Sequence, residues 1–450
     1  MADILTNEVA HIKAEDNRIH RESDEKSFEE SVKPLEMYAE GRWRAWSTVF
    51  GAWLIQFCAV GIVSSFGVLQ EFYTTTWLPD SSASSISWIG SIQIGLEYFM
   101  SPLGGELMDR GHFRAITWSG CVLFVFSLFM SSLAGNKFYQ ILLSQGIGMG
   151  LGVGLLFLPT AVVPIRHFRE GHAFVIGLVD SSISVGGLAF SIGLNYLIQG
   201  SLGFHWGIRV AAFITLGCFI LGCAMMTYPK KRFDEGAAIV HPSWKRVLKG
   251  AGKDWPYLLA ILQGFVMSLG TFVPPFYVQL FAQMHGSSKT TSFYALAVLN
   301  FTGMFGRVIP NYLADRFGVL NIYIPCLTIG GALCFAMLGA TTPEGLFLFA
   351  VFYGFFFGAT NGMYLPLINE VSISSGNGNH LWKRCGLSLI PPGIAALIGP
   401  PIAGQIVGPN YIWWQGILFA SLTMLAAVGL VILSRHLMMK AKEAPNSMSK

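Results

Sequence analysis

The sequence predicts an all-α polytopic membrane protein, with twelve transmembrane helices in two pseudosymmetric six-helix bundles. Its 450 residues are 53% hydrophobic and only 12% charged, and their mean hydropathy is +0.53. This composition is too apolar for a soluble protein with a polar shell. Apolar runs of about 20 residues, the length that crosses a bilayer, recur along the chain.

The predicted spans follow one another from residue 47 to residue 434. They lie near 47–71, 87–108, 116–135, 139–163, 174–199, 206–228, 255–282, 292–313, 319–340, 345–369, 386–407 and 412–434. The first forty residues carry many charges and no apolar core, so we expect a cytosolic disordered tail over 1–44 and no cleavable signal peptide. The first span then acts as the insertion signal.

The longest polar interruption divides the chain into two halves. It runs over 229–254 and leaves an N-terminal six-helix bundle over 45–228 and a C-terminal one over 255–436, with a cytosolic tail over 437–450. A repeat supports this division, because GELMDRG at 105–111 follows the second span and NYLADRFG at 311–318 follows the eighth. Two related bundles can rock about a midplane site, which gives alternating access.

Lysine and arginine are distributed unequally between the two sides of the membrane. Both tails and the loops after the even-numbered spans hold most of the 29 cations, whereas only Lys137 and Lys289 lie in outer loops. Cationic loops are retained in the cytosol, so both termini are predicted to be cytosolic. We expect a multi-pass protein of the plasma membrane, with the vacuolar membrane as the alternative.

Several function classes are disfavoured by what the sequence lacks. The net charge of +4 follows the membrane topology and forms no basic patch, so no nucleic-acid partner is expected. The seven cysteines show no metal-like pairing, and there is no HExxH motif and no phosphate-binding GxxxxGK[ST] loop. We therefore predict no metal, no cofactor and no enzymatic activity.

The most informative residue is Arg307, which lies inside the eighth apolar run. A bare guanidinium in hydrocarbon costs about 3 kcal/mol or more, so Arg307 needs a partner or a watery cavity. Asn300, Met304, Arg307 and Asn311 recur at helical spacing and form a stripe that could line such a cavity. The guanidinium could bind a carboxylate through two hydrogen bonds. Pairing with an internal acid and snorkelling toward the inner face are the alternatives.

Two acids, Asp180 and Glu97, lie well inside predicted spans and are candidate partners of Arg307. A buried carboxyl can be held protonated by desolvation and can lose its proton when water or a cation arrives, which is how transporters relay protons. The competing interpretation for Asp180 is a static hydrogen bond with neighbouring serines. Glu106, near the end of its span, is interpreted as interfacial.

Further candidate residues occur in three spans and in both Asp-Arg turns. Pro274 and Pro275 should kink or break the seventh span. Plausible cavity residues, each of which could equally serve packing, are Ser64, Tyr277, Asn361 and Tyr364. The turns carry Asp109 with Arg110 and Asp315 with Arg316. We interpret them as a charged clasp in which the acids meet neighbouring helix ends, which would break and re-form as the bundles rock.

The duplicated Asp-Arg turns, the six-plus-six division and the run QGIGMGLGVGLLFLP in the fourth span resemble the major facilitator superfamily. Its monocarboxylate-porter-like branch, of fungal type, is the narrower resemblance. The segments that carry it are EGRWRAWSTVFGAW at 40–53, SSFGVLQEFY at 64–73, SWIGSIQ at 87–93, LLFLP at 155–159, SVGG at 184–187, GFHWGIRVAAF at 203–213 and GMFGRVIPNYLADRFG at 303–318.

The resemblance implies secondary active transport of small carboxylates or larger organic metabolites, often with proton coupling. The family's eighth-helix arginine matches Arg307. Where the animal lactate carriers have an aspartate one turn earlier and a lysine in the first helix, this chain has Gly303 and, at about the matching position, Ser64.

The predicted function is therefore secondary active transport of a small organic acid or secondary metabolite by alternating access. The expected partners are this small-molecule substrate, the lipid bilayer and, as a candidate coupling ion, the proton. One alternative is import or export of a neutral vitamin-like or drug-like solute. Another is a nutrient sensor of the same fold that transports nothing.

Overall fold

The computed structural model describes residues 42–78, 81, 83–228, 244–375, 381–408 and 411–447. Helices and their connecting turns account for the secondary structure of these residues, as the composition predicts. Most of the predicted N-terminal tail over 1–44 lies outside the described residues. So does the first part of the central loop, 229–243.

The N-terminal half runs through helices that correspond to the first six predicted spans. They are α2 Arg42–Ser64 and α3 Phe66–Phe72, η1 Tyr73–Trp77, α4 Ala83–Phe99 and α5 Ser101–Asp109, α6 Phe113–Leu133, α7 Phe138–Ile141, η2 Leu142–Met149 and α8 Gly150–Val162, η3 Pro164–His167, α9 His172–Gln199 and α10 Gly203–Met225.

The C-terminal half follows a short helix, α11 Trp244–Ala251, which lies within the predicted central loop. Its helices are α12 Trp255–Thr271 and α13 Val273–Met284, α14 Lys289–Phe317, α15 Val319–Ala336, η4 Met337–Gly339, α16 Pro343–Gly362 and α17 Tyr364–Ser374, α18 Leu381–Val407 and α19 Trp413–Ser447. Helix α19 includes most of the residues predicted to form the C-terminal tail. Strong helix formers such as Leu437, Met438 and Ala441 favour this continuation of the helix.

Within the described ranges, eleven helical segments are long and apolar enough to cross a membrane. The remaining predicted span, 87–108, coincides with α4 and α5, which are separated at Met100 shortly before Pro102. Backbone hydrogen bonds continue across this break, because Met100 N donates to Leu96 O at 3.1 Å and Gly104 N donates to Met100 O at 3.0 Å. The second passage is thus an interrupted helix, shaped by a proline that cannot donate a backbone hydrogen bond.

Proline and glycine mark other helix ends that the sequence predicts. The seventh passage breaks at Phe272, so that Pro274 and Pro275 fall in the first turn of α13, where a missing N–H is tolerated. Helix α14 ends before Gly318, whose φ is +89°, and the first Asp-Arg turn contains Gly111 with a φ of +79°. Side chains with a Cβ rarely adopt this left-handed backbone.

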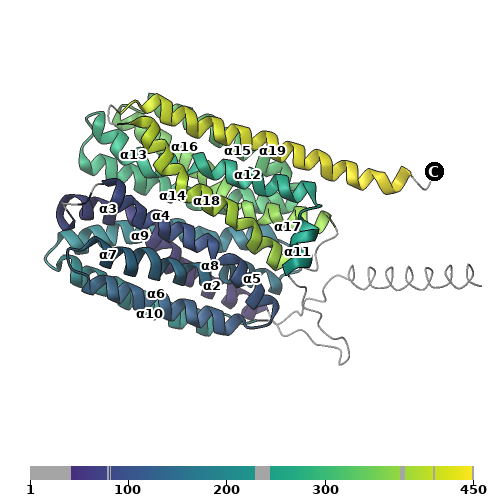
Figure 1. Ribbon diagram of the computed structural model, residues 1–450, viewed down its shortest axis with the longest axis horizontal. Helices are drawn as coiled ribbons and strands as arrows, with labels where there is room; N and C mark the ends of the chain where they lie inside the picture. Colours follow the sequence, from purple (N-terminus) through teal and green to yellow (C-terminus); the bar gives the residue numbers. More distant parts are fainter. Residues whose placement is uncertain are drawn as a thin grey trace, which may run out of the picture. The chain divides into compact units, whose positions relative to one another are not determined.

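The helices of the two halves meet mainly where α9 contacts α14 and where α18 contacts α4 and α5, with smaller contacts of α9 with α16 and α17. Figure 1 shows α2 to α10 packed side by side in purple to teal and α12 to α19 in green to yellow. Helices α9 and α14 approach closely because Gly177 faces α14, where a Cβ would overlap the carbonyl oxygen of Arg307. This contact sets the geometry of the site described below.

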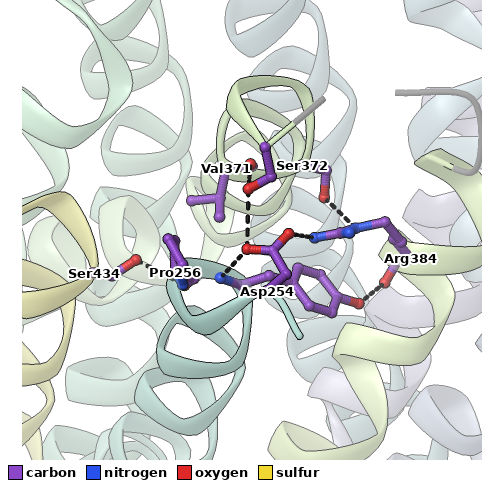
Figure 2. Close-up of polar contacts among 8 residues, drawn as sticks. Asp254, Pro256, Val371, Ser372, Arg384 and Ser434 are labelled. Atoms are coloured by element: carbon purple, nitrogen blue, oxygen red, sulfur yellow. Dashed lines mark hydrogen bonds and ion pairs between the residues drawn. The ribbon is translucent and has the colours of Figure 1, made fainter. Parts of the chain in front are cut away.

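A buried ion pair ties together the ends of α12, α17 and α18 (Figure 2). Arg384 donates from Nη2 to Asp254 Oδ2 at 2.5 Å and from Nε to Ser372 Oγ at 3.1 Å. Asp254 Oδ1 accepts from Tyr257 N at 3.2 Å and Ser375 Oγ at 3.0 Å, and Tyr257 Oη donates to the Arg384 carbonyl at 2.7 Å. Asp254 is therefore both the N-cap of α12 and the anion that holds Arg384.

Candidate functional site

Arg307 lies in the middle of α14, with its side chain buried against α9 and α16. Its Nη1 donates to Ser184 Oγ of α9 at 2.7 Å, and its Cζ lies 5.9 Å from the ring centroid of Phe357 on α16. The Nε–H of Arg307 is buried and donates to no atom of the described chain. The guanidinium therefore keeps hydrogen-bonding capacity that the surrounding protein does not satisfy.

Both predicted acids lie near this guanidinium without a direct ion pair to it. Asp180 of α9 is 5% exposed and Glu97 of α4 is 4% exposed, and their charges are close enough to act on Arg307. The salt bridges found in the described ranges do not include Arg307. Asp180 Oδ1 accepts no hydrogen bond from described residues. The neighbouring Ser181 instead donates to the Leu178 carbonyl at 2.6 Å, so the predicted static bond to that serine is not present.

The site is built from both halves of the chain. Asp180 and Ser184 stand four residues apart on α9, so they share one face of that helix, while Arg307 reaches them from α14. Gly303, one turn before Arg307, leaves this space open, because a Cβ there would lie 3.1 Å from Ser184 Oγ and 3.8 Å from Arg307 Nη1. The arrangement can bind an anion at the guanidinium and can hold or release a proton at a carboxyl.

Asn300 and Ser64 meet α9 at the same place, near Gly187. A Cβ on Gly187 would lie 3.1 Å from Ser64 Cβ and 3.5 Å from Asn300 Oδ1. Gly187 follows Ser184 by three residues, about one helical turn. Asn300 Nδ2 donates only weakly to its own helix, at 3.3 Å to Leu296 O.

The rest of the α14 stripe differs along its length. Asn311 is fully buried and donates to the Arg307 carbonyl at 2.7 Å, so it braces the backbone at the site. Met304 is half-buried.

The other predicted cavity residues make structural contacts. Tyr364 Oη donates to the Ser388 carbonyl at 2.8 Å, which has lost its helical partner because Pro392 has no N–H. Tyr277 Oη donates to the Pro400 carbonyl at 2.8 Å, and Asn361 Nδ2 donates to the Phe357 carbonyl at 2.9 Å. Both tyrosine hydroxyls thus stabilise the proline-rich α18, and the described contacts do not bring them to Arg307.

The second Asp-Arg turn contacts the opposite half of the chain. Asp315 accepts at Oδ1 from Ala173 N at 3.0 Å and at Oδ2 from Phe174 N at 2.7 Å. Both N–H groups lie in the first turn of α9, where backbone donors have no acceptor within the helix. A carboxylate is electrostatically favoured at this helix end. Arg316 donates to the hydroxyl of Tyr312 on its own helix.

The first Asp-Arg turn can be compared only in part. The side chain of Asp109 lies outside the described residues. Arg110 donates from Nε to Glu106 Oε1 at 2.7 Å, one turn earlier on α5.

Sequence reasoning missed an ion pair between the two halves. Lys383 of α18 is 1% exposed, and its Nζ lies 2.6 Å from Glu106 Oε2 of α5. Glu106, interpreted from the sequence as interfacial, is therefore buried within the protein and paired across the two halves. The four-residue spacing of Glu106 and Arg110 indicates the local pair, but no sequence signal joins Glu106 to a lysine in a distant predicted loop.

Residues 31–380 match the Major Facilitator Superfamily. The chain belongs to this superfamily. It is 33% identical over 394 residues to the aspyridones efflux protein of Emericella nidulans, covering 87% of this chain and 77% of that one. It is 31% identical over 392 residues to the agnestins efflux protein of Paecilomyces divaricatus, covering 87% of each. It is 30% identical over 404 residues to the fujikurins efflux protein of Gibberella fujikuroi, covering 88% and 84%.

A solved structure shares the major facilitator fold. The structure of a variant of the E. coli fucose:proton symporter superposes with a TM-score of 0.68, at 16% sequence identity, over 87% of this chain and 99% of that one. The protein is thus a multi-pass membrane transporter of a small-molecule substrate and not an enzyme, as the sequence predicts.

Proposed function

We propose that this transporter exports an anionic organic acid or secondary metabolite from the cell by alternating access. The observation that carries the proposal is Arg307, a buried guanidinium between the halves whose Nε–H is unsatisfied and to which no carboxylate of the described residues is directly paired. A buried cation that no carboxylate contacts directly is only partly compensated. An anionic group of the substrate would offset that cost through two charge-assisted hydrogen bonds.

The neighbours of Arg307 support a substrate contact shared by both halves. Asn300 and Ser64 are further contact residues in this proposal, because they flank the α9 surface next to Ser184. Met304 is included because it shares the α14 stripe with Asn300 and Arg307 and is half-buried. Movement of α9 against α14 would open the site, since the two helices contribute different groups to it. The contact of Asp315 with the start of α9 would break and re-form in that movement, which is the clasp role proposed for the Asp-Arg turns.

Export is supported by relatives. The proteins similar to this chain include efflux proteins for aspyridones, agnestins and fujikurins. The distribution of lysine and arginine supports placement with both termini in the cytosol, and we assign the transporter to the plasma membrane. The segments that resemble the monocarboxylate-porter-like branch support a carboxylate as the recognised group.

Metabolite profiling tests the function directly. Cells that carry the gene and cells that lack it would be compared for metabolites inside the cell and in the medium. An acidic metabolite should accumulate inside cells without the gene and return to the medium when the gene is restored. Unchanged profiles, together with purified protein that binds ligands in vesicles but moves none of them, would favour a sensor and reject the proposal. A neutral exported compound would favour the alternative substrate class.

Asp180 is expected to link proton binding to substrate binding. One cation faces two acids here, so protonation of one carboxyl removes a negative charge and favours an anion beside Arg307. Acidifying the compartment that holds the substrate should therefore accelerate transport. Asp180→Asn should make the rate insensitive to that pH, measured as flux in vesicles at a series of pH values on the substrate side. Ser181→Ala, one residue along α9, is the control, and an unchanged pH response in Asp180→Asn would exclude this role.

A further inference from the structure

Helix α11 has two chemically different faces. Val247 and Ala251 are buried against the protein, at 3% and 4% exposure. Lys245, Leu248 and Lys249 are exposed. They share the opposite face of the helix, since residues three and four apart lie side by side. Lys253 continues this exposed surface in the turn after the helix. The helix is thus anchored by its apolar face and presents lysines and one leucine outward.

The position of α11 places this face at a membrane boundary. The membrane-crossing segment Trp255–Met284 begins four residues after α11 ends. Trp255 itself is 65% exposed, and Trp43 at the start of the first membrane-crossing segment is 83% exposed. Exposed tryptophans at span ends are typical of the interface between lipid and water. Leu248 is 51% exposed, so the lysine-bearing face of α11 also presents an apolar side chain.

The segment that forms this surface carries charges of one sign. The segment from Trp244 to Lys253, WKRVLKGAGK, contains no acidic residue. The next residue, Asp254, is engaged by Arg384 at 2.5 Å and is 8% exposed, so it does not neutralise the exposed lysines. A cationic surface with an apolar side chain at the level of the lipid headgroups is complementary to an anionic leaflet.

We propose that α11 and the turn after it form a binding site for anionic phospholipids in the leaflet at this end of the transporter. Lys245, Lys249 and Lys253 contact the headgroups, while Leu248 and Trp255 enter the interfacial region. The proposed orientation makes this the cytosolic leaflet. The lipid site is connected to the contact between the halves, because the Trp244 ring lies 5.4 Å from Nζ of Lys383, the residue that pairs with Glu106.

The test is photochemical labelling of the full chain in phosphatidylcholine vesicles that contain some photoactivatable phosphatidylserine in both leaflets. After irradiation, peptides from a protease that does not cleave at lysine are mapped by mass spectrometry. Label should appear on the peptide around residues 244–255, and K245Q/K249Q/K253Q should reduce it about tenfold. Higher salt should also reduce labelling of the unmodified protein, because headgroup attraction is screened.

A matched variant separates a local site from a general charge effect. K137Q/K289Q/K440Q removes the same charge at three exposed lysines elsewhere on the surface and should leave labelling of α11 unchanged. Photoactivatable phosphatidylcholine should label α11 equally in all three proteins. Equal phosphatidylserine labelling of the α11 variant and the unmodified protein would overturn the proposal. So would an equal loss in the control variant. Elution of each variant as a single folded species keeps the comparison valid, since all six lysines are exposed.

Discussion

Replacing Arg307 with alanine is expected to reduce transport of the anionic substrate about a hundredfold, because two charge-assisted hydrogen bonds are lost together. The same change leaves Asp180 and Glu97, both buried, without the cation that acts on them. Flux into vesicles that contain the purified variant measures the effect without the complication of cellular metabolism.

Lysine at this position should be an intermediate case. Arg307→Lys keeps the positive charge but cannot form two parallel hydrogen bonds with one carboxylate, so a loss of about tenfold is expected. Arg209→Ala is the control, since Arg209 of α10 stacks on Trp206 with 4.9 Å between its Cζ and the ring centroid and takes no part in the site. Full activity of Arg307→Ala with an anionic substrate would contradict the proposed contact.

Replacing Arg384 with methionine is expected to lower the free energy of unfolding by about 3–5 kcal/mol, because Asp254 would stay buried without its counter-ion. Asp254 also caps α12 and binds Ser375, so the loss should loosen the ends of α12, α17 and α18 together. Thermal unfolding of the purified protein in detergent provides the measurement.

The neighbouring lysine offers a matched control for this prediction. Lys383→Met removes a buried cation of the same helix turn, but its partner Glu106 keeps Arg110 at 2.7 Å and is 11% exposed at the side chain. A smaller loss of stability is therefore expected. The double variant Asp254→Asn with Arg384→Met should recover part of the loss, since no buried charge is left unpaired. Equal destabilisation by Lys383→Met and Arg384→Met would show that the buried Asp254 charge is not the cause.

Local chemistry explains which parts of the fold the sequence predicts well. A run of about 20 apolar residues is long enough to cross a bilayer whatever surrounds it, so the positions of the spans agree with the helices of the structure. Pro274 and Pro275 interrupt a helix for a reason contained in their own covalent structure. The split of the predicted second span into α4 and α5 at Met100 is a finer local effect of the same kind, caused by Pro102.

The chemistry of the site depends on contacts that local patterns do not contain. Arg307 is identifiable from the sequence because a cation in an apolar run is costly wherever the chain goes. Its partner is not, since Ser184 lies 123 residues away and is one of several serines near Asp180. Tyr277 and Tyr364 are similar cases, because a buried hydroxyl can face a cavity or a backbone carbonyl, and only the packing of α18 decides between them.

The sequence by itself determined the class of protein, the succession of apolar spans, the repeat in the two halves and the residue most in need of a partner. These follow from composition, length and residue chemistry, which are properties of short segments. The tertiary structure alone decided that Arg307 contacts Ser184, that Arg384 pairs with Asp254 across 130 residues, and that Lys383 joins α18 to Glu106 of the other half. Each of these requires two distant segments to be packed together, because an ion pair or hydrogen bond forms only within a few ångströms.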